Sequence, residues 1–238
     1  MNVPQSGPGG PRTPDPSARA ALFDVDGTLT DTNALHVTSW WEALRQAGHH
    51  IPTHAVHHAL GLPGRDLVAH LLGPDRDRDE DERINTAHDV LYATYFDRIA
   101  TTPRAGDLLH ALAADDWRVV LVTSASGAEL SALRRAIDAD DAIYATTSSD
   151  DVDRGKPHPE PIHQALELAG TPHGRAVFVG DSVWDMRAGR NADVACVGLL
   201  CGGIPSADLE AAGAGSVRQD PADLLHSLGT GPFAQVGA

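Results

Sequence analysis

Acidic side chains that could hold a cation are concentrated in two short segments of the sequence. Asp24 and Asp26 lie in FDVDGTLTD, and Asp181 and Asp185 lie in GDSVWD. If the two segments meet in one crevice, their carboxylates repel each other strongly unless a cation is present, and an all-oxygen set of ligands suits a hard ion such as Mg²⁺. A helix from residue 183 onwards would place Asp181 and Asp185 about one turn apart, so that both could reach the ion or its waters. The sequence therefore predicts a magnesium site.

Two further segments carry groups that suit a phosphoryl group. Thr123 and Ser124 end an apolar run, and Lys156 lies in a Gly-Lys-Pro turn. Lys156 is the only lysine among 18 basic residues, and a compact ammonium fits a narrow site beside a carboxylate better than a wide guanidinium does. Ordinary turns, in which Asp and Gly follow strands, would account for any one of the four segments but not for all four together. The combination favours a catalytic site.

The four segments follow or flank short apolar runs that are typical of strands. These runs are apolar on both faces, as in a buried parallel sheet, and they cover residues 18–25, 118–123, 142–145, 175–180 and 194–199. Helical patterns alternate with them over residues 105–114, 128–137, 159–169 and 183–191. The alternation predicts an α/β protein with a doubly wound, mostly parallel, Rossmann-like sheet. Ligands of such sheets bind beyond the carboxyl ends of the strands, where the four segments are expected.

The alternation of strands and helices is interrupted once. No strand pattern occurs between the first two predicted strands, where helical patterns cover residues 34–47, 65–72 and 82–99. We therefore expect a helical cap domain of residues 33–102, inserted after the first strand into a core domain of residues 18–32 and 103–238. Residues 1–17 are rich in Pro, Gly and Ser and are expected to form a disordered tail.

The composition excludes several classes of partner. The 18 basic and 33 acidic side chains give a formal net charge of −15, which argues against binding to nucleic acid or to an anionic membrane surface. No run approaches the roughly 18 apolar residues of a spanning helix, and the N-terminus lacks the apolar core of a secretory signal. Cys196 and Cys201 lie in an apolar stretch and are expected to be buried in a strand and the turn after it. A cytoplasmic protein, monomeric or homodimeric, is expected.

Together, the four segments resemble the motifs of the haloacid dehalogenase superfamily of aspartate-nucleophile phosphatases. The resemblance covers about residues 19–228 and rests on Asp24-Val25-Asp26-Gly27-Thr28, Thr123, Lys156 and Gly180-Asp181-Ser182-Val183-Trp184-Asp185. The helical insertion resembles the cap of the phosphoglycolate phosphatase and β-phosphoglucomutase branch, which Asp31-Thr32-Asn33, His36 and Trp40 also match. The resemblance implies hydrolysis of a small phosphorylated metabolite with Mg²⁺ as cofactor.

The resemblance also implies roles for individual residues. Asp24 would attack phosphorus and form an aspartyl-phosphate, which divides one hard displacement into two easier ones. Asp26 would protonate the leaving oxygen and then deprotonate the hydrolytic water. Thr123 and Ser124 would bind the transferring phosphoryl group, and Lys156 would neutralise charge on it and on the nucleophile.

The implied metal ligands bear on the reaction class. Mg²⁺ would be held by Asp24, the backbone carbonyl of Asp26 and Asp181, with Asp185 positioning the ion or its waters. The dehalogenases that named the superfamily lack an aspartate two residues after the nucleophile and need no metal, so dehalogenation is not expected. A sugar-phosphate mutase of the same branch is an alternative, although its essential cap lysine has no counterpart here, since Lys156 is the only lysine. Alternatives of another class are a phospho-aspartate receiver, which is about half this length, and a non-catalytic binding protein.

The cap is expected to determine the substrate, because it closes over the crevice and excludes water. His36 and Arg65 are its candidate substrate-binding residues. The alternatives are a structural role for His36 and a surface salt bridge for Arg65. The histidines at positions 54, 57 and 58 invite comparison with a zinc site, but they lack a carboxylate or cysteine partner at a convincing spacing.

Overall fold

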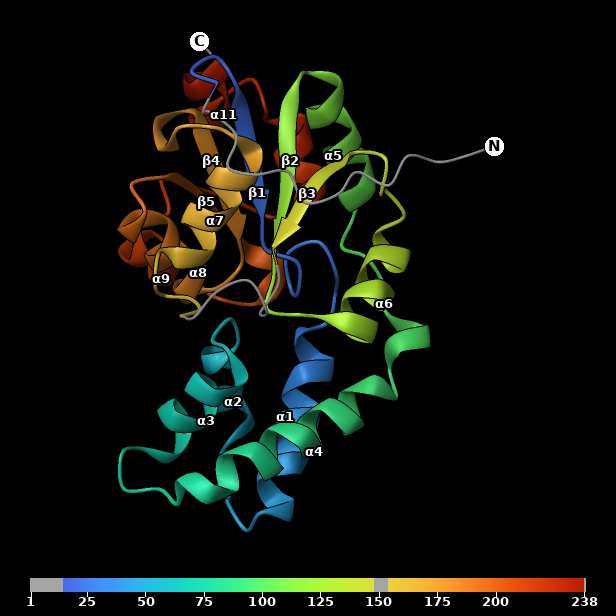
Figure 1. The fold of residues 1–238 in the computed structure, drawn as a ribbon, viewed down its shortest axis with the longest axis vertical. Coiled ribbons are helices and arrows are strands. Elements are labelled where there is room, and N and C mark those ends of the chain that lie inside the picture. The colour runs from blue at the N-terminus through green and yellow to red at the C-terminus, as the bar shows by residue number, and fades with distance from the viewer. Residues whose placement is uncertain (1–14, 148–153, 238) are drawn as a thin grey trace.

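The computed structural model describes residues 15–147 and 154–237, and within these ranges a six-stranded parallel sheet forms the centre of the protein (Figure 1). The strands lie in the order β3-β2-β1-β4-β5-β6, and each pairs with its neighbours in parallel. They are β1 (Arg19–Phe23), β2 (Trp117–Val122), β3 (Ile143–Thr147), β4 (Ala176–Gly180), β5 (Ala195–Leu199) and β6 (Ser216–Arg218). The predicted α/β class and doubly wound sheet are confirmed, and β6 is an addition to the five predicted strands.

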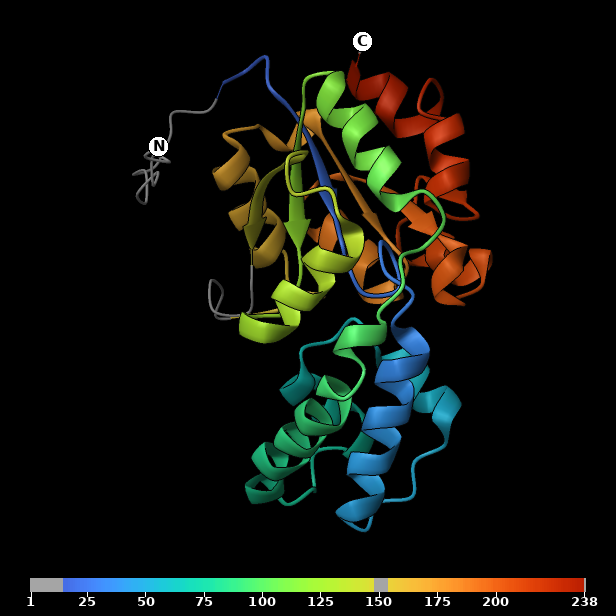
Figure 2. The same ribbon diagram turned by 90° about the vertical axis from the view of Figure 1, so that its right-hand side faces the viewer.

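Helices cover both faces of the sheet (Figures 1 and 2). Successive strand residues point to opposite sides, so Phe23 and Leu121 belong to one apolar cluster while Leu22 and Val120 belong to the other. The first cluster includes residues of α5 (Ala105–Ala114), α6 (Gly127–Ile137), α10 (Pro221–His226) and α11 (Gly231–Gly237). The second includes residues of α7 (Glu160–Ala169), α8 (Val183–Asn191) and α9 (Ser206–Ala212). Burial on both faces explains why the central strands are apolar throughout.

A helical cap lies between β1 and β2, as predicted, and faces the carboxyl ends of the strands (Figure 1). Its helices are α1 (Asn33–Gln46), α2 (Thr53–Ala59), α3 (Gly64–Leu72) and α4 (Asp81–Ala93), with short 3-10 turns at Arg78–Glu80 and Phe96–Arg98. Trp40, Leu44, Val56, Leu67 and Ile84 are among the residues of a third apolar cluster, separate from the two around the sheet. The cap therefore has a core of its own, which lets it pack as a unit over the sheet edge.

The N-terminal end of the described chain lies against the sheet domain. The backbone N–H of Asp15 donates a hydrogen bond to the Gly170 carbonyl at 2.9 Å, and Arg118 pairs with Asp15 at 3.4 Å. Of the tail predicted for residues 1–17, residues 15–17 are described, and the backbone N–H of Ser17 donates to Asp15 Oδ1 at 2.9 Å. Residues 1–14 lie outside the described residues. Among the helices described, none has the length and apolar character that crossing a membrane requires.

Both cysteines lie in the elements expected for them. Cys196 is buried in β5, and Cys201 is partly buried in the 3-10 turn Leu200–Gly202 that follows. Both thiols are free, and burial raises the pKa of each to about 12. Neither is therefore a reactive nucleophile near neutral pH.

Candidate active site

The carboxyl ends of three adjacent strands lie level with one another below the cap. Phe23 of β1 pairs with Leu121 of β2 and with Val179 of β4, so the chain leaves all three strands at one edge of the sheet. A cavity of about 640 Å³ lies between this edge and the cap. The predicted site residues that line it are Asp24, Asp26, Thr123, Ser124, Lys156 and Asp181 from the core, and His36 and Arg65 from the cap. Asp185 is fully buried and does not line the cavity.

Lys156 forms a buried ion pair with Asp24, the predicted nucleophile. Its ammonium also contacts Asp185 Oδ1 at 2.8 Å and lies 5.6 Å from the centre of the Phe178 ring. Burial alone would lower the pKa of Lys156, but the carboxylates of Asp185 and Asp24 raise it above its ordinary value. Burial raises the pKa of Asp24 well above its ordinary value; the neighbouring carboxylates add to this effect and the lysine opposes it. The ammonium therefore stays charged and compensates part of the buried negative charge.

Asp24, Asp181 and Asp185 form a compact group of buried carboxylates in which one oxygen from each residue lies within 4.8 Å of the others. Burial, followed by the charge of Asp185, raises the pKa of Asp181 to about 7. Thr28 Oγ1 and Asn33 Nδ2 donate to the two oxygens of Asp181, at 2.9 and 2.8 Å, and so orient its carboxylate. Three carboxylates around one ammonium leave excess negative charge, and an oxygen-only donor set suits a hard divalent cation. The group fits the predicted metal site.

Asp185 also stabilises the start of α8. Its Oδ2 accepts hydrogen bonds from the backbone N–H of Ser182 at 3.0 Å and from the Ser182 hydroxyl at 2.6 Å, while its own N–H donates to that hydroxyl. This capping box satisfies free N–H groups at the helix end. Only Oδ1 of Asp185 faces the site, where it holds Lys156 in place.

Gly202 lies so close to Asp181 that a side chain there must disturb the metal-ligand group. An added Cβ would lie 1.8 Å from Asp181 Oδ2, and the Gly202 carbonyl accepts a hydrogen bond from Asn33 at 3.1 Å. We expect Gly202→Ala to lower the free energy of unfolding by about 1–3 kcal/mol and to weaken binding of a divalent cation, both measured by thermal unfolding with and without Mg²⁺. Gly174→Ala is the matched control, because an added Cβ there meets nothing within 4 Å; the same behaviour in both variants would contradict the prediction.

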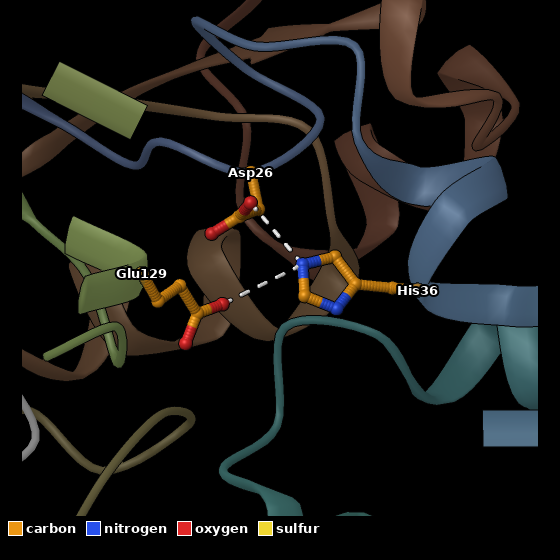
Figure 3. Close-up of side chains that lie close together, drawn as sticks. All are labelled: Asp26, His36 and Glu129. Carbon is orange, nitrogen blue, oxygen red and sulfur yellow. Dashed lines mark hydrogen bonds and ion pairs between the residues drawn. The ribbon is translucent and has the colours of Figure 1, made fainter. Parts of the chain in front are cut away.

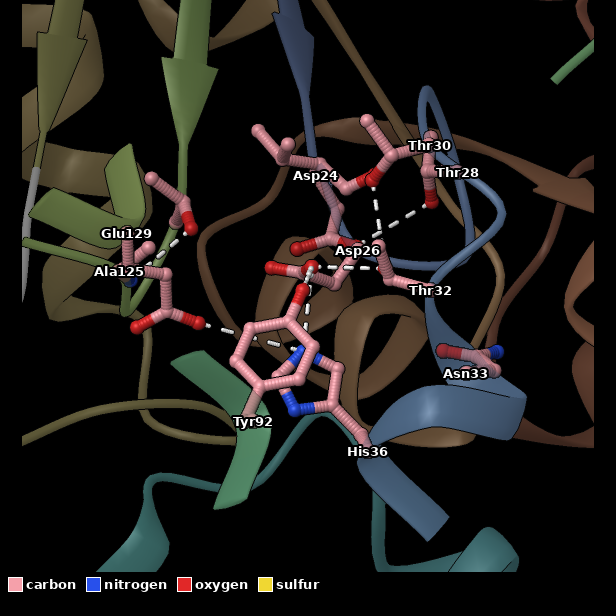
Figure 4. A network of polar contacts seen from close by, with 12 residues as sticks. Asp24, Asp26, Thr28, Thr30, Thr32, Asn33, His36, Tyr92, Ala125 and Glu129 are labelled. Atoms are coloured by element: carbon pink, nitrogen blue, oxygen red, sulfur yellow. Dashed lines mark hydrogen bonds and ion pairs between the residues drawn. The ribbon is translucent and has the colours of Figure 1, made fainter. Parts of the chain in front are cut away.

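Asp26 belongs to a second polar group, which joins the core to the cap (Figures 3 and 4). Its Oδ1 accepts a hydrogen bond from Thr32 Oγ1 at 2.7 Å and contacts His36 Nε2 at 3.2 Å. His36 Nε2 also lies 4.0 Å from Glu129 Oε1, and the ring of Tyr92 stacks on the imidazole with centroids 3.8 Å apart. Burial would raise the pKa of Asp26, but the hydrogen bond and charge of His36 hold it below its ordinary value. Asp26 is therefore stabilised by a residue of the cap.

The charges in this second group depend on one another. Burial would lower the pKa of His36, but its hydrogen bond with Asp26 and the charges of Asp26 and Glu129 raise it above its ordinary value. Burial and the charge of Asp26 raise the pKa of Glu129 to about 7. His36 is thus the positive partner of two carboxylates that come from the core, and this contact forms only where α1 lies over the sheet edge.

The other candidate residues of the cap differ in their surroundings. Arg65 is exposed at the rim of the cavity. His57 contacts the Gly202 carbonyl through Nε2 at 2.7 Å and so ties α2 to the core. Within the part of the chain that the structure describes, neither His57 nor its neighbours His54 and His58 belong to a group that could hold a metal ion. A zinc site at these histidines is therefore not supported.

Thr28, Asn33 and Glu129 are among the polar residues of the site that sequence reasoning missed. Thr28 and Asn33 were part of recognised motifs without a role, and the structure shows that both orient Asp181. Glu129 was not predicted, and its signal in the sequence was weak: it is an acidic residue in the first turn of the helix after Thr123 and Ser124.

Comparisons with known proteins show which proteins this chain is similar to. The protein-family model described as haloacid dehalogenase-like hydrolase matches residues 18–193. Pyrophosphatase PpaX from Bacillus velezensis is 28% identical, with 90% of this chain and 98% of the relative covered. Phosphoglycolate phosphatase from Photorhabdus laumondii is 27% identical, with 89% of this chain and 92% of the relative covered. The crystal structure of a hydrolase from Pseudomonas syringae matches with a TM-score of 0.84 at 32% identity, over 88% of this chain and 97% of that chain.

Proposed function

Because this chain belongs to the haloacid dehalogenase-like hydrolases, we propose that it is a Mg²⁺-dependent phosphatase that hydrolyses a small phosphorylated metabolite through a covalent intermediate on Asp24. The observation that carries the proposal is the setting of Asp24. Its carboxylate lines the cavity, is paired with Lys156, and belongs to a group that fits a divalent cation. The phosphatases among the relatives support the same reaction class.

The proposed reaction has two displacement steps at phosphorus. In the first, an oxygen of Asp24 bonds to phosphorus while the bond from phosphorus to the ester oxygen breaks, and Asp26 gives a proton to the departing oxygen. In the free protein His36 holds the pKa of Asp26 below its ordinary value, so Asp26 takes up this proton when the negative charge of the bound phosphate ester raises that pKa. In the second, water attacks phosphorus, Asp26 takes a proton from it, and Asp24 leaves as a carboxylate with release of inorganic phosphate. The hydrogen bonds that Asp26 accepts from described residues all fall on Oδ1, so its Oδ2 is available to the substrate.

The remaining groups offset charge around the phosphoryl group. Lys156 neutralises charge on Asp24 and on a phosphoryl oxygen, and Thr123 and Ser124 bind phosphoryl oxygens from the end of β2. The residues that would hold Mg²⁺ are Asp24, Asp181 and the backbone carbonyl of Asp26, supported by Asp185. When bound, the ion supplies positive charge that reduces the repulsion between nucleophile and phosphate.

Phosphate release from p-nitrophenyl phosphate and from a panel of sugar, polyol and carboxylate phosphate esters tests the proposal. We expect turnover of at least one ester by the folded protein in the presence of MgCl₂. If the folded protein releases no phosphate from any of these esters under these conditions, the proposed function is wrong.

Removal of divalent cations is expected to stop phosphate release and to lower the unfolding temperature. A ligand at a hundred times its Kd stabilises a protein by about 2.7 kcal/mol, so returning Mg²⁺ after EDTA treatment should raise the unfolding temperature by about 5–10 °C in a chain of this size. In Asp181→Asn the shift should nearly vanish, because the substitution removes a buried ligand oxygen. Differential scanning fluorimetry measures the shift, and Asp75→Asn, at an exposed position of the cap, is the matched control. An undiminished shift in Asp181→Asn would contradict the assigned ligands.

A further inference from the structure

Glu129 points into the cavity from the first turn of α6. This turn follows Thr123 and Ser124 at the carboxyl end of β2, so the carboxylate lies beside Asp26 and His36 (Figure 3). Oxygen atoms of Glu129 and Asp26 lie within 4.8 Å of each other. This spacing is short enough for neighbouring functional groups of one small molecule to contact both carboxylates.

The carboxylate of Glu129 has few partners in the protein. Its side chain is only 27% exposed, and its charged contact among residues 15–147 and 154–237 is His36 Nε2 at 4.0 Å. That distance is too long for a hydrogen bond. A mostly buried carboxylate is costly unless hydrogen-bond donors satisfy it. A ligand with a donor placed at Glu129 would therefore be favoured.

The part of the cavity next to the cap carries an excess of negative charge. Asp66 and Asp89 line it from the cap and Glu129 from the core. The positive side chains lining the cavity include Arg65 at the rim, His36, which is already paired with Asp26, and Lys156, which two buried carboxylates already engage. A second anionic group on the substrate would meet repulsion here, whereas a hydroxyl or ammonium group would be attracted.

We infer that Glu129 selects the leaving group: its carboxylate accepts a hydrogen bond from a hydroxyl or ammonium group next to the scissile ester oxygen. The favoured substrates are then phosphate esters of polyols, sugars or amino alcohols. Substrates with an anionic leaving group, such as 2-phosphoglycolate and pyrophosphate, are disfavoured. The inference rests on the proposed function, because it takes Asp26 as the group that protonates the leaving oxygen beside Glu129.

The ratio of kcat/KM for glycerol 3-phosphate or ethanolamine phosphate to that for 2-phosphoglycolate tests this inference. In the Mg²⁺-loaded wild type we expect at least one of the two ratios to exceed about tenfold. In Glu129→Gln, which keeps the size of the side chain and removes its charge, that ratio should fall by about tenfold, and kcat/KM for 2-phosphoglycolate should rise. The amide oxygen of the variant still accepts a hydrogen bond from a hydroxyl but cannot compensate the charge of an ammonium group. A larger fall in the ratio for ethanolamine phosphate therefore identifies ammonium as the selected group, and a similar fall in both ratios identifies hydroxyl. Glu167→Gln, exposed on α7, is the matched control.

The outcomes separate this inference from the proposed function. If the wild type hydrolyses p-nitrophenyl phosphate but prefers 2-phosphoglycolate to both other esters, or if Glu129→Gln leaves the ratios unchanged, the selection by Glu129 is wrong and the phosphatase activity stands. If no ester is hydrolysed, the proposed function itself fails. The wild-type ratios need no variant, so poor folding of Glu129→Gln cannot hide a negative result. The rise in activity towards 2-phosphoglycolate is a gain that a purely structural role of Glu129 would not produce.

Discussion

Asp24→Asn is expected to reduce kcat/KM for phosphate release by at least about 10⁴-fold. The neutral amide is a poor nucleophile towards phosphorus, whereas the carboxylate oxygen can form the covalent bond and leave again. The two side chains have the same size, so Lys156 and Thr28 keep a neighbour at this position. Steady-state phosphate release measures the loss, and mass spectrometry of acid-quenched protein should find a phosphoryl group on Asp24 of the wild type and none in the variant.

The same substitution is expected to leave the metal-free fold at least as stable as the wild type. Burial, with the charges of Asp185 and Asp181, raises the pKa of Asp24 well above its ordinary value. At a pH above this raised pKa, the charge on Asp24 therefore costs free energy of folding, and this cost is absent below the ordinary pKa, where the carboxyl is protonated in both states. Asparagine removes the charge, so thermal unfolding in EDTA should occur at an equal or higher temperature, with Asp75→Asn as the control.

A stable Asp24→Asn variant that retains more than about a hundredth of the wild-type activity would show that another group attacks phosphorus. Slow deamidation of asparagine back to aspartate could mimic such a result. Asp24→Ala, which cannot revert in this way, distinguishes the two explanations. Its smaller side chain leaves Lys156 with Asp185 as its remaining partner among the described residues.

The meeting of Asp24, Thr123 and Asp181 at one edge could be predicted from the sequence because it depends on local patterns. Each of these residues follows a short apolar run, and parallel strands bring all their carboxyl ends to the same edge. The register of Phe23 with Leu121 and Val179 confirms that these strands end level. Apart from the hydrogen bond by which Asn33 of α1 orients Asp181, nothing about the cap is needed for this part of the site to form.

The contact between His36 and Glu129 could not be predicted in the same way. These residues are separated in the sequence by the rest of the cap and by β2, and they meet only because α1 and the first turn of α6 both reach the cavity. No periodicity within either helix encodes such a contact, which depends on how the cap packs onto the core. Sequence reasoning could place His36 at the site through its motif but could not identify its partners.

Some local features of the sequence, among them the capping box at the start of α8, were also overlooked. Ser182 and Asp185 are three residues apart at the start of a helix, which is the spacing of a capping box. That spacing predicts that one oxygen of Asp185 is used by the helix end and is not free for an ion. Five short elements were missed because seven residues or fewer are too few for a periodic pattern to stand out; they are α2, α9, β6, α10 and α11.

Lys156→Met is expected to lower both activity and stability, because it removes the ammonium that two buried carboxylates share. Breaking a buried ion pair by removing one partner costs about 3–5 kcal/mol, so the metal-free variant should unfold at a markedly lower temperature. The rate of phosphate release should fall by about 10³-fold, since charge developing on the phosphoryl group loses its cation. Lys156→Arg keeps the charge, but its wide guanidinium does not fit a site in which the lysine is only 7% exposed.

The double variant Lys156→Met/Asp185→Asn separates the two effects. If the instability of Lys156→Met comes from uncompensated carboxylates, neutralising Asp185 should restore part of the free energy of unfolding, because fewer buried charges then lie together. Activity should not return, since the phosphoryl group still lacks its cation. Chemical denaturation in EDTA measures the first quantity and phosphate release the second. Recovery of activity in the double variant would mean that Lys156 acts only by balancing the charge of Asp185. If the double variant is no more stable than Lys156→Met, the lost packing against Phe178, rather than the uncompensated charge, destabilises the fold.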